Sequence, residues 1–405
     1  MNYIRKFFLL FLALSLLLGS FSGCQTPKPS LPDTAYTTEP AAEDSTPSTL
    51  LSDEALFAAL SETMSYPDRR YYISRLSGHL LAGFTALYQG VLSFEEYIEF
   101  PVPMTKQELE AIVLYLEYDC PELMYFMTEE SNYTFRWADT AETKIKGIYP
   151  PYSMTESEYY TNLTAVQAKI DMLLAETKEL SPYEAERLIF DRLVSSCIYN
   201  YDAEDSNNAY GVLVNGVARC EGFSRTFTWL MHELDIPCFS LFGDSTTGDL
   251  PHSWNVVRLG DAYYEIDVTH DIVSDGGTPI PNAYSHFNVT ATVHESYYSL
   301  WPACTLLSTL PDRTATADNY HVKNGRYVTS LDEAEALLTR LLSEYASQSD
   351  ADFSLRFADT SDYEAFQNLL YNMVNAWCQE NRIPVNYRYY QFSEANVYQF
   401  VVRYH

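Results

Sequence analysis

Basic residues are scarce in this chain of 405 residues, which has 25 Lys and Arg against 55 Asp and Glu and a formal net charge of −30 at pH 7. Affinity for nucleic acid comes mainly from Lys and Arg that neutralise phosphates, so the shortage excludes a nucleic-acid partner. It also excludes adhesion to an anionic lipid surface through a basic patch. We interpret the acidity as a source of solubility. The more specific alternative is a preference for cationic substrates.

The seven cysteines include no CxxC motif, so we expect no zinc site built on them. If Cys24 is modified and one further cysteine is catalytic, five remain and cannot all pair. Most thiols should therefore be free and buried, with at most one or two disulfides. His286 and His294 lie eight residues apart without a neighbouring acid or thiol cluster, so we expect no metal site there.

The N-terminus has the pattern of an export signal. In residues 1–23, a twelve-residue apolar run, Phe7–Leu18, is too short to span a bilayer. It leads into Phe-Ser-Gly-Cys24, which resembles a bacterial lipoprotein box. We therefore expect a bacterial cell-surface protein held on the membrane by lipid on Cys24, with secretion after ordinary cleavage as the alternative. Residues 24–50 hold five Pro and should form a flexible linker.

Intrinsic disorder is excluded by the 47% of hydrophobic and 15% of aromatic residues, and the folded body divides into three parts. Residues 51–180 should form an N-terminal α/β region, residues 181–310 a catalytic domain, and residues 320–405 a small C-terminal α/β module. The C-terminal module carries no chemical motif, so we interpret it as a structural or docking domain.

Local patterns place the main elements of the body. Capping boxes at Thr105 and Ser181 predict helices that follow them, and residues 123–126 read as a buried strand. Further helices are expected at 156–180, from Cys220, after Ser330 and at 362–380. Strands are expected around Phe135 and at 238–243, 252–258, 262–268, 353–357, 386–391 and 397–404.

A candidate catalytic cysteine stands where one of these helices begins. Cys220 follows the turn-prone Asn215-Gly216 and starts an apolar helical stripe. A cysteine at a helix N-terminus feels the positive end of the macrodipole and free backbone N–H groups. Both favour the thiolate, and the same N–H groups can stabilise an oxyanion. Gly222, in the first turn, is a candidate for close approach of substrate, or is simply tolerated there.

A hairpin supplies a candidate base and acid. If its turn is centred on Leu259-Gly260, paired positions sum to 519, and His252 and Asp267 meet that condition. They would then lie directly opposite one another on one face of the sheet. A carboxylate beside an imidazole fixes its tautomer and stabilises its charged form. A one-residue bulge would break this register.

Three blocks of residues resemble the transglutaminase-like superfamily: Gly216-Val-Ala-Arg-Cys220-Glu-Gly-Phe-Ser, Pro-His252-Ser-Trp254-Asn-Val, and Tyr-Tyr-Glu-Ile-Asp267-Val-Thr-His-Asp. The resemblance covers roughly residues 181–305. It implies an α+β fold, with a papain-like core in which the nucleophile-bearing helix packs on an antiparallel sheet. It identifies Cys220, His252 and Asp267 as the catalytic triad.

The resemblance implies acyl transfer through a thioester, acting on peptide or isopeptide amides, with no metal or organic cofactor. Hydrolysis is favoured over transfer because water is abundant, and cell-wall peptides are one candidate substrate. Tyr210 is the candidate oxyanion donor, and Arg219 and Trp254 are candidate cleft residues. The sequence departs from the family at His270, where a Trp is common. The rival interpretation is a surface lipoprotein that keeps the fold but only binds.

Overall fold

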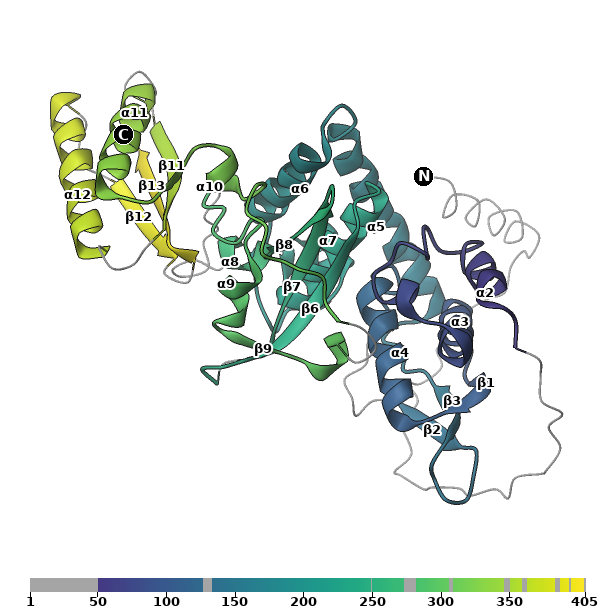
Figure 1. The fold of residues 1–405 in the computed structure, drawn as a ribbon. Helices are drawn as coiled ribbons and strands as arrows, with labels where there is room; N and C mark the ends of the chain where they lie inside the picture. The colour runs from purple at the N-terminus through teal and green to yellow at the C-terminus, as the bar shows by residue number, and fades with distance from the viewer. Residues whose placement is uncertain are drawn as a thin grey trace, which may run out of the picture. The chain divides into compact units, whose positions relative to one another are not determined.

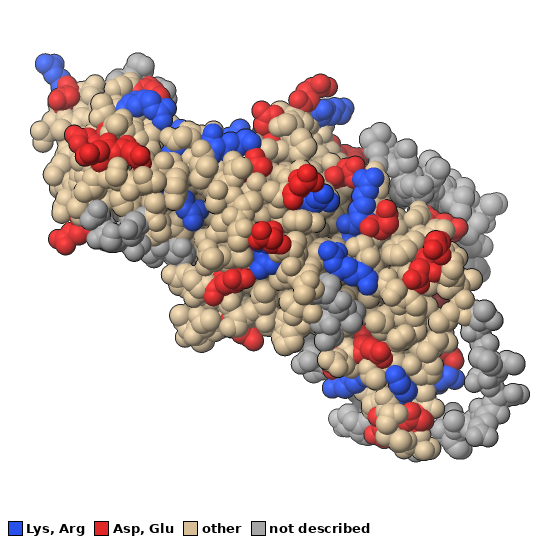
Figure 2. All heavy atoms as spheres, viewed as in Figure 1, with Lys and Arg blue, Asp and Glu red and all other residues tan. Residues whose placement is uncertain are grey.

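The computed structural model describes residues 50–126, 133–248, 250–272, 282–305, 309–345, 350–358, 363–382, 387–392 and 395–403. The expected signal peptide, the lipidation site Cys24 and all but the last residue of the linker lie outside these ranges. None of the helices in the described ranges is both long and apolar enough to cross a bilayer. On the face shown in Figure 2, acidic and basic side chains are interspersed.

The chain folds into two compact units. One runs to Glu117 and takes in Phe126–Ser153, and the other comprises Tyr118–Tyr125 and the chain from Met154 onward. The first unit has an antiparallel sheet in the order β1-β3-β2. Its elements are α2 (Asp53–Leu60), η1 (Ile73–Arg75), α3 (Gly78–Leu92), β1 (Ile98–Met104), α4 (Lys106–Asp119), β2 (Thr134–Trp137) and β3 (Ile145–Tyr149).

The capping boxes predicted from the sequence are present. Glu108 bonds back to the N–H of Thr105, and Glu184 does the same at Ser181. Residues 123–126 are buried as expected, but they form turns and a single bridge from Phe126 to Tyr152, so the prediction of a strand there is wrong. Their continuous apolar run reflects burial, which does not distinguish a strand from a buried turn.

The second unit contains the expected triad residues Cys220, His252 and Asp267, and Figure 1 shows its α7 beside β6 and β7. Its first half has an antiparallel sheet in the order β8-β7-β6-β9, and α7 packs against β6 and β7. The elements are α5 (Glu156–Glu176), α6 (Pro182–Ser196), β4 (Ile198–Tyr199), η2 (Gly211–Asn215), β5 (Val217–Ala218), α7 (Cys220–Glu233), β6 (Cys238–Ser245), β7 (His252–Leu259), β8 (Ala262–Ile266), α8 (Val268–Ile272), α9 (Ala291–Glu295), β9 (Tyr298–Leu300) and η3 (Pro302–Thr305). A helix that begins at Cys220 and packs on an antiparallel sheet is the α+β arrangement predicted from the sequence.

Apolar and polar contacts both fix α7 on its sheet. The helix buries Phe223, Phe227 and Leu230. Across the interface, the Asn255 amide on β7 donates to the carbonyl of Ser224 at 2.8 Å and to the Thr228 hydroxyl at 2.9 Å. These directional bonds set the position of the helix along β7, and with it the position of Cys220 relative to the strand that begins at His252.

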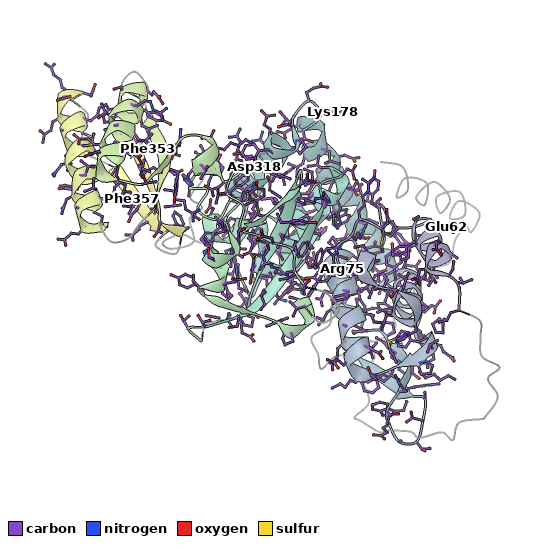
Figure 3. All side chains as sticks on the ribbon, in the orientation of Figure 1. Glu62, Arg75, Lys178, Asp318, Phe353 and Phe357 are labelled. Carbon is purple, nitrogen blue, oxygen red and sulfur yellow. The ribbon has the colours of Figure 1, made fainter. Side chains whose placement is uncertain are left out.

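The last part of the chain folds into a small module of one sheet and the helices that pack on it. Its sheet has the order β10-β11-β13-β12, parallel between β10 and β11 and antiparallel elsewhere. Phe353 and Phe357 belong to an apolar core that this sheet shares with two helices (Figure 3). The elements are α10 (Tyr320–Lys323), β10 (Tyr327–Val328), α11 (Leu331–Tyr345), β11 (Asp350–Phe357), α12 (Tyr363–Glu380), β12 (Tyr387–Phe392) and β13 (Val397–Arg403).

A carboxyl group is buried in α6. Glu186 is fully buried, and its Oε2 accepts a hydrogen bond from the Asn288 amide at 2.9 Å. Its Oε1 and the Asn288 Oδ1 are both buried without a hydrogen-bond partner. Burial, only partly offset by this hydrogen bond, raises the pKa of Glu186 to about 8. The side chain is therefore mostly protonated at neutral pH. In this form the carboxyl group can donate a hydrogen bond within the core.

Candidate active site

Cys220 is the first residue of α7, and 7% of its surface is exposed. The residue before it, Arg219, is the N-cap but makes no side-chain capping bond. The first N–H groups of the helix are therefore not satisfied by a capping side chain. These groups and the positive end of the helix macrodipole favour a negative charge on the sulfur or on an oxygen beside it.

His252 and Ser253 are the polar groups that act on the Cys220 thiol. Burial alone would raise the pKa of Cys220, but the hydrogen bond and charge of His252, with the bonds from Ser253, bring this pKa below its ordinary value. Burial likewise opposes the charge on His252, but Asp267 and the sulfur together raise the pKa of His252 to about 10. The pair is thus stabilised as thiolate and imidazolium.

Asp267 holds the other side of the imidazole. The His252 Nε2 lies 2.5 Å from the Asp267 Oδ2, so Nδ1 is the ring nitrogen that this carboxylate does not use. The second carboxylate oxygen accepts the N–H of Thr269 at 2.8 Å. Although burial would raise the pKa of Asp267, the neighbouring charges of His252 and His270 and the bonds to imidazoles hold it well below the usual range. The order sulfur, imidazole, carboxylate is the geometry of a thiol activated by an oriented base.

The predicted hairpin register is wrong, although the contact it predicted is present. Observed pairs run from Asn255 with Ile266 to Leu259 with Ala262, so paired positions sum to 521 and not to 519. The turn is Gly260-Asp261, one residue later than predicted, with φ of +59° at Gly260. A change of two in the sum keeps every side chain on its face. Asp267 follows the end of β8 and reaches His252 diagonally.

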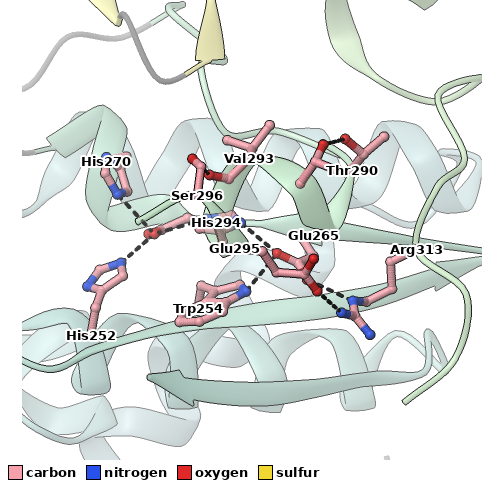
Figure 4. Close-up of polar contacts among 12 residues, drawn as sticks. His252, Trp254, Glu265, His270, Thr290, Val293, His294, Glu295, Ser296 and Arg313 are labelled. Atoms are coloured by element: carbon pink, nitrogen blue, oxygen red, sulfur yellow. Dashed lines mark hydrogen bonds and ion pairs between the residues drawn. The ribbon is translucent and has the colours of Figure 1, made fainter. Parts of the chain in front are cut away.

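A buried charge network continues behind the triad (Figure 4). His294 lies between two carboxylates: its Nδ1 is 2.7 Å from Glu265 and its Nε2 is 3.5 Å from Asp267. Arg313 completes the network with its Nε 2.7 Å from Glu265. Burial opposes the charge on His294, but the two carboxylates raise its pKa. The sequence-based view that no acid accompanies His294 is therefore wrong, because both acids come from distant positions in the chain.

Trp254 belongs to the core. It is fully buried, its Nε1 donates to Glu265 at 2.9 Å, and its ring stacks on His294 with the centroids 4.9 Å apart. The His252 ring lies 6.0 Å away at a 17° interplanar angle. Trp254 thus packs behind His252 in the core, and of its two predicted roles the structure supports core packing.

The other predicted cleft residues have local partners. Arg219 pairs with Glu221 at 2.6 Å and lies over the Tyr201 ring, so its charge is engaged. A Cβ added to Gly222 would lie 2.3 Å from the carbonyl oxygen of Ser206. The missing side chain therefore admits the preceding loop, and the close approach at Gly222 is by this chain's own backbone.

Tyr210 and Tyr199 are the two tyrosines to compare as oxyanion donors. Tyr210 precedes η2, and its backbone N–H donates to the Asn208 side chain at 2.9 Å. No contact in the described residues joins it to Cys220, so its role stays a prediction. Tyr199 does interact with Cys220: burial first, then the charge of that sulfur, raises the pKa of Tyr199 to about 12. Sequence reasoning missed it, since Tyr199 is adjacent only through the pairing of β4 with β5 beside Cys220.

A metal ion could be held beside the triad. His252, Asp267 and His270 each offer one ligand atom, and these three atoms lie within 4.8 Å of one another. Sequence spacing does not predict this cluster, because His270 is separated from the acid by a turn of helix and from His252 by the hairpin.

Comparison with known proteins matches this region. Residues 171–268 match the model of the transglutaminase-like superfamily. This chain carries a transglutaminase-like core. The match includes Cys220, His252 and Asp267, and it ends before His270 and His294. It supports cysteine-dependent acyl transfer as the chemistry to test, in a family that also has inactive members.

A solved structure described as "Crystal structure of a TGase" shares 15% identity with the chain, at a TM-score of 0.26. The match covers 36% of this chain and 46% of that one, so the chain spans less than half of that protein. A likeness this weak supports no assignment of function. No curated protein matches the chain. The assignment of the transglutaminase-like core therefore depends on the family match and on the α+β arrangement described above.

Proposed function

We propose that the transglutaminase-like core is a cysteine-dependent acyl-transfer enzyme that cleaves peptide or isopeptide amides. The single observation that supports it best is the contact of His252 Nε2 with the Asp267 carboxylate at 2.5 Å, made by the same imidazole that lowers the pKa of the Cys220 thiol. A structural ion pair would not need a thiol at a helix N-terminus beside the same imidazole.

The first half of the reaction forms a thioester. The Cys220 thiolate attacks the amide carbonyl carbon, and N–H groups at the start of α7 stabilise the resulting oxyanion. His252 gives the Nδ1 proton to the nitrogen as the C–N bond breaks, and the amine leaves. Asp267 keeps the imidazole oriented throughout and stabilises its positive charge.

The second half releases the acyl group. Water loses a proton to His252 and attacks the thioester, and the C–S bond breaks to return the Cys220 thiolate and a carboxylic acid. An amine in place of water would give a new amide. We favour hydrolysis because water is the abundant competitor, and incubation of an acyl donor with and without a primary amine separates the two products.

The proposal is tested by alkylation of the full chain with iodoacetamide, mapped by mass spectrometry in the presence of a chelator. Since the pKa of Cys220 is lowered, labelling should be rapid at pH 6, where an ordinary thiol with a pKa of roughly 8.5 is almost entirely protonated. His252→Ala should slow labelling about tenfold or more, whereas His79→Ala, in the first unit, should leave the rate unchanged.

Turnover should also depend on pH in a defined direction. It should fall as the pH rises through about 10, because His252 then loses the proton that the leaving amine needs. If Cys220 in the folded chain labels at pH 6 no faster than a cysteine peptide, the proposal fails and the binding-only interpretation gains.

We also propose, from the export signal and lipoprotein box, that the enzyme acts at the bacterial cell surface, anchored through Cys24. Cell-wall peptides are then a candidate substrate class. Metabolic labelling with a fatty-acid analogue should be lost in Cys24→Ala. Labelling that survives the substitution would contradict lipid attachment at this position.

A further inference from the structure

Asp267 is surrounded by imidazoles on one side. Its Oδ2 lies 2.5 Å from the Nε2 of His252, 3.6 Å from the Nε2 of His270 and 3.5 Å from the Nε2 of His294. Catalysis by a triad needs one of these three contacts. The other two histidines are therefore in excess of what the proposed reaction requires.

Two imidazoles and a carboxylate form a donor set that suits a borderline transition metal ion. Zinc binds nitrogen and carboxylate oxygen at about 2.0–2.2 Å, so two ligand atoms in a tetrahedral site are about 3.4 Å apart. The 3.6 Å separation between His270 and Asp267 already matches this spacing. The His252–Asp267 pair must widen by about 1 Å, as expected when a metal replaces the shared proton.

The surroundings orient these ligands. The Asp267 Oδ1 is held by the N–H of Thr269, and the His270 ring is stacked on His286 with the centroids 3.9 Å apart. Hydrogen bonds and packing of this kind fix metal ligands in place and are often worth 10- to 100-fold in affinity, as an order-of-magnitude figure.

The site is also reachable. The Asp267 side chain is 1% exposed, but those of His252 and His270 are 10% and 24% exposed, so an ion can enter from their side with water as a fourth ligand. The buried Nε2 of His294 lies 3.5 Å from the same carboxylate oxygen and so faces the site.

We propose that a divalent transition metal ion, for which Zn²⁺ is the best match, binds to His252 Nε2, Asp267 Oδ2 and His270 Nε2 and blocks the triad. The binding stands on the geometry alone, whereas the block rests on the proposed function.

The inhibitory effect follows from the location of protons. With the metal on Nε2, a neutral His252 must carry its proton on Nδ1, the nitrogen that exchanges protons in the proposed reaction. That nitrogen then has no lone pair to accept the proton of the thiol or of an attacking water. The same ion withdraws Asp267 from its role of orienting His252. Removal of the metal restores both groups, so the inhibition is reversible.

Binding is tested without reference to activity. Co²⁺ is titrated into the full chain carrying Cys220→Ser, and the visible absorption of the bound ion is recorded. We expect one equivalent to bind with the intense bands of a low-coordinate nitrogen and oxygen site, and Zn²⁺ to displace it. Adding His270→Gln should weaken binding at least tenfold, and His79→Gln should not. Binding that is absent or unchanged in His270→Gln overturns the site.

The inhibitory role is tested by alkylation of Cys220 in chains without the serine substitution. Zn²⁺ should slow labelling, and His270→Gln should raise the half-inhibiting Zn²⁺ concentration at least tenfold relative to its own metal-free rate. Equal concentrations in the two chains would mean that the metal sits directly on the thiol, which overturns the proposal. If Cys220 is not reactive even without metal, the proposed function fails, while the cobalt spectrum still decides whether the site exists.

Discussion

Replacing Glu186 with Gln should make the fold less sensitive to alkaline pH. Glu186 is fully buried in α6, and its pKa is raised to about 8 from an ordinary value of 4.5. A carboxyl group with a raised pKa in the folded state stabilises the fold below its unfolded pKa, and this contribution is lost as the pH rises through the folded value. Gln keeps the shape and the acceptor for Asn288 but cannot ionise.

The size of the effect follows from these two pKa values. Each pKa unit between the folded and unfolded states corresponds to about 1.4 kcal/mol of free energy of unfolding. Compared with low pH, ionisation of Glu186 therefore lowers the free energy of unfolding of the wild-type chain by about 1 kcal/mol at pH 5, about 3 kcal/mol at pH 7 and about 4 kcal/mol at pH 8. The Gln variant cannot ionise at this position and does not show this decrease. The difference in free energy of unfolding between the two chains should therefore grow by about 3 kcal/mol from pH 5 to pH 8.

Urea denaturation of both chains at pH 5, 6, 7 and 8 measures this difference directly. Other titrating groups are common to the two chains and cancel. Glu184→Gln, two positions earlier in the same helix, is a matched control: bonds to Ser181 lower the pKa of Glu184, so this group titrates below pH 5 and its replacement should give a difference that stays nearly constant from pH 5 to pH 8. A Glu186→Gln difference that stays constant across the pH range would refute the assignment of a protonated, buried carboxyl group.

Two other substitutions test the packing around the site. Gly222→Ala places a Cβ 2.3 Å from the Ser206 carbonyl, so we expect a loss of about 1–3 kcal/mol in urea unfolding; no loss would mean that the loop is not packed on the helix. Arg313→Met leaves Glu265 without its guanidinium partner in the core, which should cost about 3–5 kcal/mol. Lys323→Met, which breaks a pair on the surface, should cost under about 1 kcal/mol, and similar losses in the two variants would contradict the buried network.

Local signals in the sequence explain what could be predicted. A capping box involves residues three apart, so Thr105 with Glu108 and Ser181 with Glu184 locate helix starts without any knowledge of the fold. The start of α7 at Cys220 follows from the apolar stripe that begins there. The alternation of side chains also predicts β7 and β8. It places the side chains of His252 and Asp267 on one face of the sheet, because successive residues of a strand point to opposite faces and a shift of two in the pairing leaves the face unchanged.

Features set by exact register or by distant partners could not be predicted. The turn at Gly260-Asp261 is one residue from the predicted centre, and nothing in the local sequence separates the two choices. Residues 123–126 are buried, but hydrophobicity alone does not report hydrogen bonding. The network that joins His294, Glu265 and Arg313 links positions up to 48 residues apart, so neither the charge pattern nor the residue spacing predicts it.

The described cysteines also determine how the protein should respond to oxidants and reductants. None of the six cysteines in the described residues forms a disulfide; all six are buried, and five of them are at most 2% exposed. Burial raises the pKa of Cys197 to about 11 and that of Cys238 further, whereas the pKa of Cys220 is lowered. Peroxide reacts with thiolates, so it should oxidise Cys220 first, to a sulfenic acid that thiols reverse. Oxidation of Cys220 is then separable from unfolding, and a reductant that restores its thiol has no disulfide in this part of the chain to break.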